Sequence, residues 1–190
     1  MEDLALAFGI IFLGELGDKS QLMALSMASR YNPWQVLGGI AVSTAANMLL
    51  SVAIGESIGY LLPQWLVLLL AGVAFIVFGL WTLRGNDEDE EGVTASGARN
   101  IFLLAAGTFF VAEFGDKTML ATITLAASNA ALAVWTGATL GMIAADAIAI
   151  VLGAWLGRRL PERPLRIGAA VVFLGVGVWT IISGVTALPW

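Results

Sequence analysis

Cysteine and histidine are both absent from this chain of 190 residues. Without cysteine, the chain can form neither disulfide bonds nor thiolate metal sites. Without histidine, it lacks the commonest nitrogen ligand of metal ions and the usual carrier of protons near neutral pH. We therefore expect any metal site in this protein to be built from oxygen ligands.

Charged residues are also scarce, at 12% of the chain against 59% hydrophobic residues. A soluble domain typically carries about 25% charged residues. Long stretches such as residues 36–53 and 66–83 contain no charge at all, which is typical of transmembrane helices. At about 20 residues per span, the chain can supply about six spans and short loops, but no separate soluble domain.

Turn residues and charges divide the chain into six expected helices. These helices lie near residues 4–28, 35–61, 64–84, 101–127, 132–157 and 165–188. The first apolar run does not resemble a signal peptide, because it begins with Glu2 and Asp3 where a basic region is required. It also carries Glu15, Asp18 and Lys19 further on. We interpret it as the first transmembrane helix.

The arginine residues between the expected spans predict the topology. All of them fall on one face of the membrane, namely Arg30, Arg84, Arg99, Arg158, Arg159, Arg163 and Arg166. By the positive-inside rule this face is cytoplasmic, so both termini are expected outside the cytoplasm. The acidic run 87–91 is then a cytoplasmic loop, either simply solvated or an antechamber that gathers cations. We expect an integral protein of a bacterial inner membrane.

A shift of 98 residues superimposes the two halves of the chain. The aligned motif residues are Glu15, Gly17, Asp18 and Lys19 with Glu113, Gly115, Asp116 and Lys117. Because each half holds three spans, an odd number, the second half must enter the membrane from the opposite side. The predicted fold is an all-α membrane protein with six transmembrane helices in two inverted three-helix repeats. Its parts are the first repeat (1–84), a cytoplasmic acidic loop (85–100) and the second, inverted repeat (101–190).

The two motifs place charged side chains at mid-membrane depth. One such side chain costs about 2.5–3.5 kcal/mol at the bilayer centre, so the motifs are expected to face the protein interior. Within each motif the glutamate is three residues from the aspartate and four from the lysine, so all three are expected on roughly one helical face. If both faces meet, four carboxylates and two lysines converge with a formal charge of −2, which a divalent cation would neutralise. The candidate cation ligands are Glu15, Asp18, Glu113 and Asp116.

Residues around the motifs have expected supporting roles. Ser20, Gln21 and Thr118 are candidates for additional neutral oxygen ligands, which suit calcium, magnesium or manganese. Lys19 and Lys117 would either hold the carboxylates ionised in the empty state or replace the cation during the return step.

Two questions about the motifs stay open at this point. Gly17 and Gly115 would permit either a close approach of helices or a local break that frees backbone carbonyls for a cation. The charged residues could also form only structural salt bridges, with each motif glutamate paired to the lysine four residues later. The two motif aspartates argue against this alternative, because a purely structural network would more naturally balance its charges.

Two polar residues of other spans are further candidates. Asp146 lies in the middle of the fifth expected helix, either as a proton-relay or supporting group or as a buried carboxylate satisfied by its neighbours. Its counterpart in the first repeat is Met48, so Asp146 breaks the repeat symmetry. Asn47 is expected to hydrogen-bond across helices, with a place on a transport pathway as the alternative.

The doubled motif resembles that of the Ca²⁺:H⁺ antiporter-2 family of Gdt-type proteins, which is marked by two copies of E-x-G-D-[KR]-[ST]. Both copies are intact here, from Glu15 to Ser20 and from Glu113 to Thr118. The resemblance covers essentially the whole chain. It implies that the two motifs form a cation site and that the protein transports manganese or calcium, with proton exchange.

Energetics favours exchange over a passive pore if the cation is exported. Moving a divalent cation out against ~100 mV, inside negative, costs roughly 2 × 2.3 kcal/mol before any concentration term. Exchange for two or more protons removes or reverses this penalty. We therefore expect a cation/proton antiporter that works by alternating access, is not an enzyme, and has no cofactor and no nucleic-acid partner.

Two other functions are alternatives. An exporter of small organic solutes could share this architecture, but its substrate carboxylate would favour a basic centre rather than a net acidic one. An intramembrane hydrolase is the second alternative. Glu15 and Glu113 occupy the positions where an intramembrane protease motif requires glycine.

The sequence ranks neither manganese against calcium nor one oligomeric state against another.

Overall fold

The computed structural model describes residues 1–84, 100–156 and 162–188, and all regular structure in these ranges is helical. The helices are α1 (Glu2–Glu15), α2 (Lys19–Arg30), α3 (Pro33–Leu61), α4 (Gln64–Arg84), α5 (Ile101–Glu113), α6 (Lys117–Ala126), α7 (Ala131–Leu156) and α8 (Glu162–Thr186). The predicted acidic loop, apart from Asn100, lies outside the described residues. So do parts of the connection between α7 and α8.

The six expected spans correspond to these eight helices because the first and fourth spans are each broken in two. Counting only the described residues, three helices are long and apolar enough to cross a bilayer unaided: α3, α4 and α7. By contrast, α1 has 14 residues. At 1.5 Å per residue it rises about 21 Å, less than the ~30 Å hydrocarbon core. The first span therefore needs α1 and α2 together, and the fourth likewise needs α5 and α6.

Local sequence signals explain where two of the helices begin. The Asn32 side chain accepts a hydrogen bond from the Trp34 backbone N–H (3.0 Å), and Pro33 follows at the first helical position of α3. Asn100 caps α5 in the same way, by accepting a bond from the Leu103 N–H (3.3 Å). Both helices thus start at an asparagine cap.

The two repeats pack in a crossed manner. Helix α5 lies on α3, while its repeat counterpart α1 lies on α7. A Cβ atom at Gly39 would fall 2.5 Å from the Phe102 carbonyl oxygen, and one at Gly137 would fall 2.4 Å from the Leu4 carbonyl oxygen. These two contacts are related by the 98-residue shift. The structure therefore has the inverted-repeat arrangement, with the first helix of each repeat packed on the second helix of the other.

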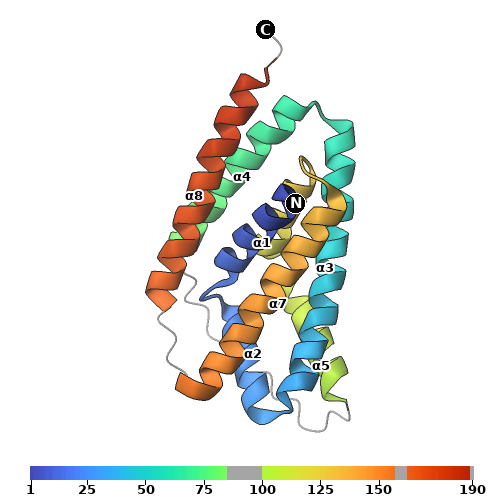
Figure 1. The fold of residues 1–190 in the computed structure, drawn as a ribbon, viewed down its shortest axis with the longest axis vertical. Coiled ribbons are helices and arrows are strands. Elements are labelled where there is room, and N and C mark those ends of the chain that lie inside the picture. Colours follow the sequence, from blue (N-terminus) through green and yellow to red (C-terminus); the bar gives the residue numbers. More distant parts are fainter. Residues whose placement is uncertain (85–99, 157–161, 189–190) are drawn as a thin grey trace.

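The third helices of the repeats, α4 and α8, form a separate pair along one side of the molecule (Figure 1). Phe75 of α4 and Phe173 of α8 stack with their ring centroids 6.1 Å apart. Phe173 also reaches α1, where a Cβ at Gly14 would lie 2.7 Å from its ring. The α4–α8 pair thus contacts α1 at Gly14, which directly precedes Glu15 of the first motif.

Candidate cation site

Each motif forms the break between two half-helices. Helix α1 ends at Glu15 and α2 begins at Lys19; α5 ends at Glu113 and α6 begins at Lys117. In each break the backbone N–H of the motif aspartate donates to the carbonyl of the motif glutamate, at 3.0 Å in the first and 3.2 Å in the second. The two breaks therefore share one backbone design.

The motif glycines supply the conformation that the breaks require. Gly17 has φ 78° and Gly115 has φ 82°, in the left-handed region that glycine adopts without steric cost. A Cβ at Gly115 would meet no atom within 4 Å. Of the two roles left open by the sequence, the local break is the one found at both glycines, and Gly115 makes no close helix contact.

The predicted helical face of each motif is wrong, because it assumed a continuous helix. The chain turns after Glu15, so Glu15, Asp18 and Lys19 do not follow the spacing of one helical surface. The turn of the break, rather than helical periodicity, holds these residues close together. The Lys19 side chain lies outside the described residues.

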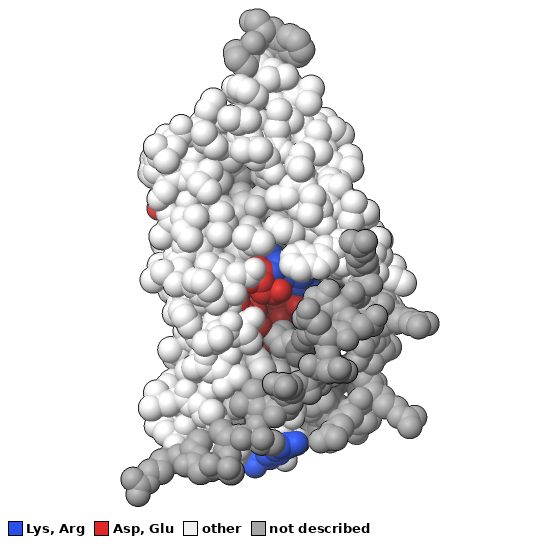
Figure 2. Space-filling view, turned by 180° about the vertical axis from the view of Figure 1, so that it is seen from behind, with Lys and Arg blue, Asp and Glu red and all other residues white. Residues whose placement is uncertain are grey.

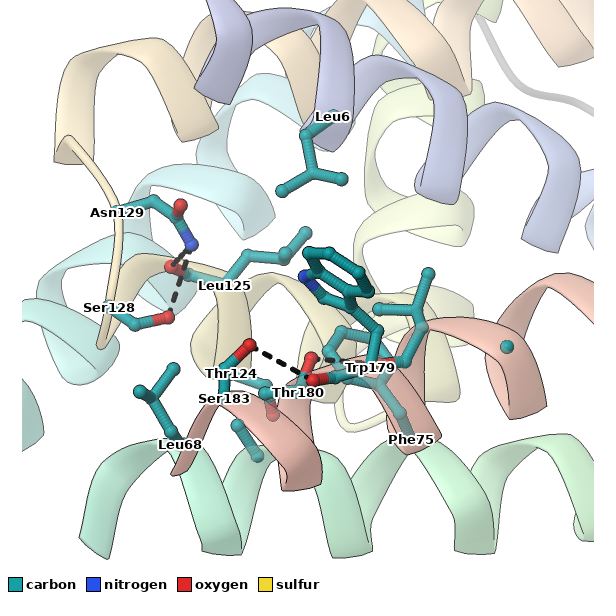
Figure 3. A pocket seen from close by; sticks show the side chains of 13 residues that line it. Leu6, Leu68, Phe75, Thr124, Leu125, Ser128, Asn129, Trp179, Thr180 and Ser183 are labelled. Carbon is teal, nitrogen blue, oxygen red and sulfur yellow. Dashed lines mark hydrogen bonds between the residues drawn. The ribbon is translucent and has the colours of Figure 1, made fainter. Parts of the chain in front are cut away.

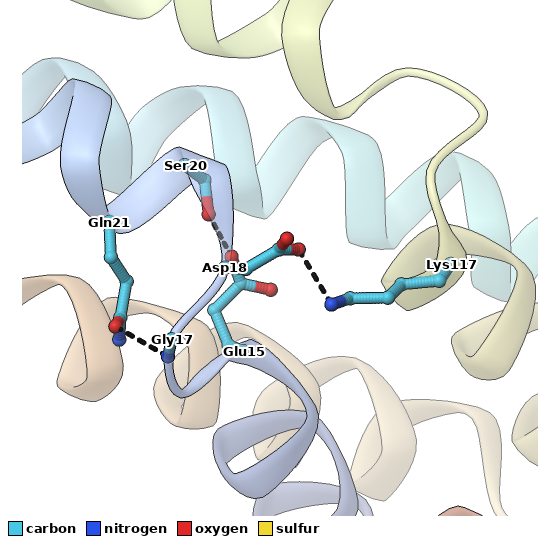
Figure 4. Close-up of polar contacts among 6 residues, drawn as sticks. All are labelled: Glu15, Gly17, Asp18, Ser20, Gln21 and Lys117. Carbon is cyan, nitrogen blue, oxygen red and sulfur yellow. Dashed lines mark hydrogen bonds and ion pairs between the residues drawn. The ribbon is translucent and has the colours of Figure 1, made fainter. Parts of the chain in front are cut away.

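The first break is held by two of the predicted supporting residues (Figure 4). The Ser20 hydroxyl donates to Glu15 Oε1. The Gln21 amide oxygen accepts from the Gly17 N–H (2.9 Å), and its amide nitrogen donates to the Ala145 carbonyl (3.1 Å). Gln21 thus ties the break to α7 beside Asp146.

The second break uses different side chains. The Gly115 N–H donates to the Met119 sulfur at 3.1 Å. The Thr122 hydroxyl donates to the Met48 sulfur (3.2 Å) and to the Thr118 carbonyl (2.8 Å). Sequence reasoning missed both methionines because it considered only oxygen ligands, although the 98-residue shift aligns Gln21 with Met119.

Asn47 makes the interhelical hydrogen bond that the sequence predicted. Its amide nitrogen donates to the Phe110 carbonyl of α5 at 3.2 Å. Its amide oxygen is buried without a hydrogen-bond partner, and the Thr118 hydroxyl oxygen is in the same state. Both atoms retain acceptor capacity near the second break.

Within the described part of the chain, an ion pair joins the two repeats. Lys117 Nζ lies 2.8 Å from Asp18 Oδ2, with side-chain exposures of 15% and 23% respectively. The structural salt bridge considered for the second motif instead paired Lys117 with Glu113 of the same repeat. The observed bridge therefore couples α6 to the first motif.

Three carboxylates near the breaks are buried and incompletely paired. Glu15 and Asp146 are 0% exposed and Glu113 is 4% exposed. Among the described residues, no hydrogen-bond partner is found for the buried atoms Glu15 Oε2, Glu113 Oε2 and both carboxylate oxygens of Asp146. The charges of Asp18 and Asp146 act on Glu15, and those of Glu15, Asp116 and Asp146 act on Glu113. The charge of Asp146 thus acts on the glutamates of both motifs, and its carboxylate has no hydrogen-bond partner in the part of the chain that the structure describes.

The carboxylates are grouped but not closed into a cage. No three acidic side chains among the described residues are near enough to hold one metal ion simultaneously. Figure 2 shows acidic atoms reaching the surface about halfway along the molecule, beside basic atoms and within an otherwise largely uncharged face. Asp18 and Lys117 form the accessible edge of the group, whereas Glu15, Glu113 and Asp146 lie inside.

A cavity of about 350 Å³ lies apart from the acidic group, between α1, α4, α6 and α8 (Figure 3). No acidic residue lines it. The hydroxyls of Thr124, Thr180 and Ser183 on its wall donate to carbonyls of their own helices, and Asn129 donates to the Leu125 carbonyl. Without a carboxylate on its wall, this cavity has no negative charge to attract a cation.

Comparison with known proteins assigns the family. The model of the divalent cation/proton antiporter GDT1 matches residues 3–90 and again 101–188, once in each repeat. A protein named putative manganese exporter from Vibrio cholerae is 35% identical over 179 residues, covering 92% of this chain and 88% of that protein. A GDT1-like protein of Synechocystis is 34% identical, covering 92% and 95%.

A third relative is longer than this chain. Protein PAM71, chloroplastic, of Arabidopsis thaliana is 30% identical, over 96% of this chain and 57% of its own length. No solved structure matches. The two family matches coincide with the two repeats and their broken-helix motifs, and the chain belongs to the GDT1 family of divalent cation/proton antiporters, membrane transporters rather than enzymes.

Proposed function

We propose that this protein exports Mn²⁺ or Ca²⁺ from the cytoplasm in exchange for protons and binds the cation between its two motif breaks. The observation that carries the proposal is the group of buried carboxylates, Glu15, Glu113 and Asp146, whose free oxygens have no hydrogen-bond partner. Burying an unpaired carboxylate is costly, so such groups pair, bind a metal ion or take up a proton. Exchange of a cation for protons uses the last two options in turn.

Charge supports a divalent cargo. Five carboxylates and the two motif lysines leave a formal charge of −3 when Asp146 is counted with the motifs. Glu15, Asp18, Glu113 and Asp116 bind the cation in this proposal, and Asp146 contributes charge or receives a proton. A divalent ion leaves one negative charge for a proton to neutralise.

Neutral groups complete the proposed site. The unpaired oxygens of Asn47 and Thr118 are available beside the second break, and Ser20 and Gln21 hold the first. The carbonyl ends of α1 and α5 also meet the breaks, and carbonyl ends of half-helices coordinate cations in other inverted-repeat transporters.

Lys117 acts as an internal competitor for the cation. In this conformation its ammonium neutralises Asp18 across the repeat boundary at 2.8 Å. Binding of the cation releases Lys117, and the ammonium returns when the cation leaves. By repeat symmetry Lys19 has the same role toward Asp116.

The distribution of basic residues supports the membrane topology in this proposal. The arginines between spans define a cytoplasmic face, so the termini lie outside the cytoplasm and the acidic loop lies within it. In Figure 1 the end of α8 and the start of α1 both lie in the upper half, and the α2–α3 connection lies at the lower end. Alternating access then moves the inverted repeats against each other around the breaks.

Flux through purified protein in proteoliposomes tests the proposal. We expect Mn²⁺ uptake into the vesicles to make the lumen more alkaline in step, because protons leave as the cation enters, and to respond to an imposed pH gradient. Glu15→Gln and Glu113→Gln should abolish it, whereas Glu56→Gln, at an exposed position of α3, should not. Metal flux that ignores the pH gradient would overturn the exchange mechanism. Absence of any divalent flux would overturn the proposed function itself.

A further inference from the structure

The two breaks have the same backbone but chemically different partners. In the first, the Gly17 N–H donates to an amide oxygen of Gln21 (2.9 Å); in the second, the Gly115 N–H donates to the thioether sulfur of Met119 (3.1 Å). Residues 21 and 119 correspond under the 98-residue shift. The hard oxygen acceptor at the first break is therefore replaced by a soft sulfur acceptor at the corresponding place of the second break.

A second pair of corresponding positions repeats this exchange. Asp146 of α7 follows Ala145, whose carbonyl is bound by Gln21 of the first break. Its counterpart, Met48 of α3, accepts a hydrogen bond from Thr122 of α6 at 3.2 Å. Because the packing of the repeats is crossed, Asp146 of α7 lies next to the residue bound by Gln21 of the first break, whereas Met48 of α3 contacts α6, which follows the second break. Both oxygen-bearing residues thus lie on one side and both sulfurs on the other.

Both methionines are buried close to the second break, although Met48 belongs to the same apolar core cluster as Ile11 and Val52. Met48 is 0% and Met119 is 5% exposed. Near the same break, Glu113 Oε2, Thr118 Oγ1 and Asn47 Oδ1 are buried without a hydrogen-bond partner. A carboxylate, neutral oxygens and thioethers form a mixed donor set. Calcium and magnesium are hard cations that take oxygen ligands, and manganese also suits oxygen ligands, whereas thioether donors select softer metal ions. A thioether therefore penalises Ca²⁺ and Mg²⁺ more than it penalises a first-row transition-metal ion such as Mn²⁺.

We propose that the two breaks are chemically unequal half-sites and that Met48 and Met119 determine cation selectivity. The oxygen half, with Gln21 and Asp146, accepts any of the divalent ions. The thioether half disfavours Ca²⁺ and Mg²⁺ and therefore favours Mn²⁺ and softer transition-metal ions. This inference rests on the proposed transport function and assigns the cargo class that the sequence left open.

Replacement of each sulfur by carbon at nearly constant volume tests the inference. Leucine conserves the volume of methionine well, so Met48→Leu, Met119→Leu and the double variant remove mainly the thioether. Met27→Leu is the matched control, because Met27 is 3% exposed in α2 and packs in an apolar cluster with Val36 and Ile40. Competition of Ca²⁺ and Cd²⁺ against Mn²⁺ flux in proteoliposomes gives the readout. Cd²⁺ is close to Ca²⁺ in size but softer.

The wild-type protein should prefer Mn²⁺ and Cd²⁺ to Ca²⁺. The double leucine variant should narrow the Mn²⁺/Ca²⁺ and Cd²⁺/Ca²⁺ ratios by roughly tenfold, the lower end of what altered ligand surroundings cost in metal sites. Met27→Leu should leave both ratios unchanged, and Met119→Gln should raise Ca²⁺ competition. Unchanged ratios in a transporting double variant would overturn the inference while leaving the proposed function intact.

A spectroscopic measurement keeps the inference testable if the double variant fails to fold. X-ray absorption of Cd²⁺ bound to the wild-type protein should show sulfur in its coordination shell. A shell of oxygen alone would contradict the role of the methionines. Absence of divalent transport by the wild-type protein would instead contradict the proposed function.

Discussion

The acidic group around the two motif breaks and the α4–α8 pair differ in how closely they follow the repeat symmetry. In the pair, Gly72 of α4 packs on the Gly177 carbonyl, and Gly79 packs on the Ala170 carbonyl, where Cβ atoms would lie 2.8 Å and 3.2 Å away. The shift of 98 residues exchanges these two contacts, so the pair is symmetric about its own axis. At two positions near the motif breaks, the same shift relates an oxygen-bearing side chain to a methionine: Gln21 to Met119, and Asp146 to Met48.

This difference shows which property constrains each region. The α4–α8 pair carries no charge from Gln64 to Leu83 or from Ile167 onward, and its contacts depend only on shape. Shape requirements are the same for both members of a two-fold pair. In the proposed function, the acidic group releases a cation to two different sides of the membrane, and unequal side chains there make the two halves distinguishable. Substitutions that alter packing and substitutions that alter charge are therefore expected to have different effects.

The largest effect is expected from removing charge at the centre. Mn²⁺ at 100 times its dissociation constant should stabilise the wild-type protein by about 2.7 kcal/mol. The double variant Glu15→Gln/Glu113→Gln should lose this stabilisation because the buried carboxylates no longer attract the ion. Thermal unfolding in detergent with and without metal gives the comparison, and Glu56→Gln is the control. Full metal stabilisation of the double variant would place the cation elsewhere.

Next in size is overpacking of the α4–α8 pair. Gly72→Ala would place a Cβ 2.5 Å from the Ile181 side chain and 2.8 Å from the Gly177 carbonyl. Overpacking of this kind typically costs about 1–3 kcal/mol. Gly175→Ala is the control, because a Cβ there meets nothing within 4 Å. Thermal unfolding should show the loss, while the ion preference stays unchanged. A changed Mn²⁺/Ca²⁺ ratio in Gly72→Ala would show that the pair takes part in selection.

The architecture was largely predictable from sequence because it depends on strong, repeated signals. Uninterrupted apolar runs marked the spans, and one fixed offset of a charged motif marked the duplication. The breaks were less predictable. The sequence does not distinguish a glycine that continues a helix, such as Gly9 within α1, from one with a positive φ that breaks it, such as Gly17.

The details of the centre escaped prediction because they depend on tertiary contacts. The spacing of Glu113 and Lys117 allowed a salt bridge within one motif as an alternative, whereas Lys117 in fact pairs with Asp18 of the other repeat. Only the crossed packing of the repeats makes this pair possible. The sulfur of Met119 had a detectable signal in its alignment with Gln21, but the search for oxygen ligands passed over it.

A smaller effect is expected at the break glycines. An alanine in the left-handed region costs about 1–2 kcal/mol, so Gly17→Ala and Gly115→Ala should each lower stability by that amount. Gly107 of α5 is the matched control, because a Cβ there meets nothing within 4 Å. Gly107→Ala should be neutral or stabilising by up to about 1 kcal/mol through helix propensity. Equal effects at Gly107 and Gly115 would mean that the break is not maintained.

The smallest effect concerns the ion pair at the edge of the centre. A double-mutant cycle of Asp18→Asn and Lys117→Gln should give a coupling energy of about 0.5–1 kcal/mol in metal-free detergent, because both side chains are partly exposed. Saturating Mn²⁺ should reduce this coupling, since the cation displaces the ammonium from Asp18. Arg30→Gln, at the exposed end of α2, paired with Asp18→Asn should show no coupling. If the Asp18–Lys117 coupling is unchanged by metal, Lys117 is a fixed structural link between the repeats and not a competitor of the cation.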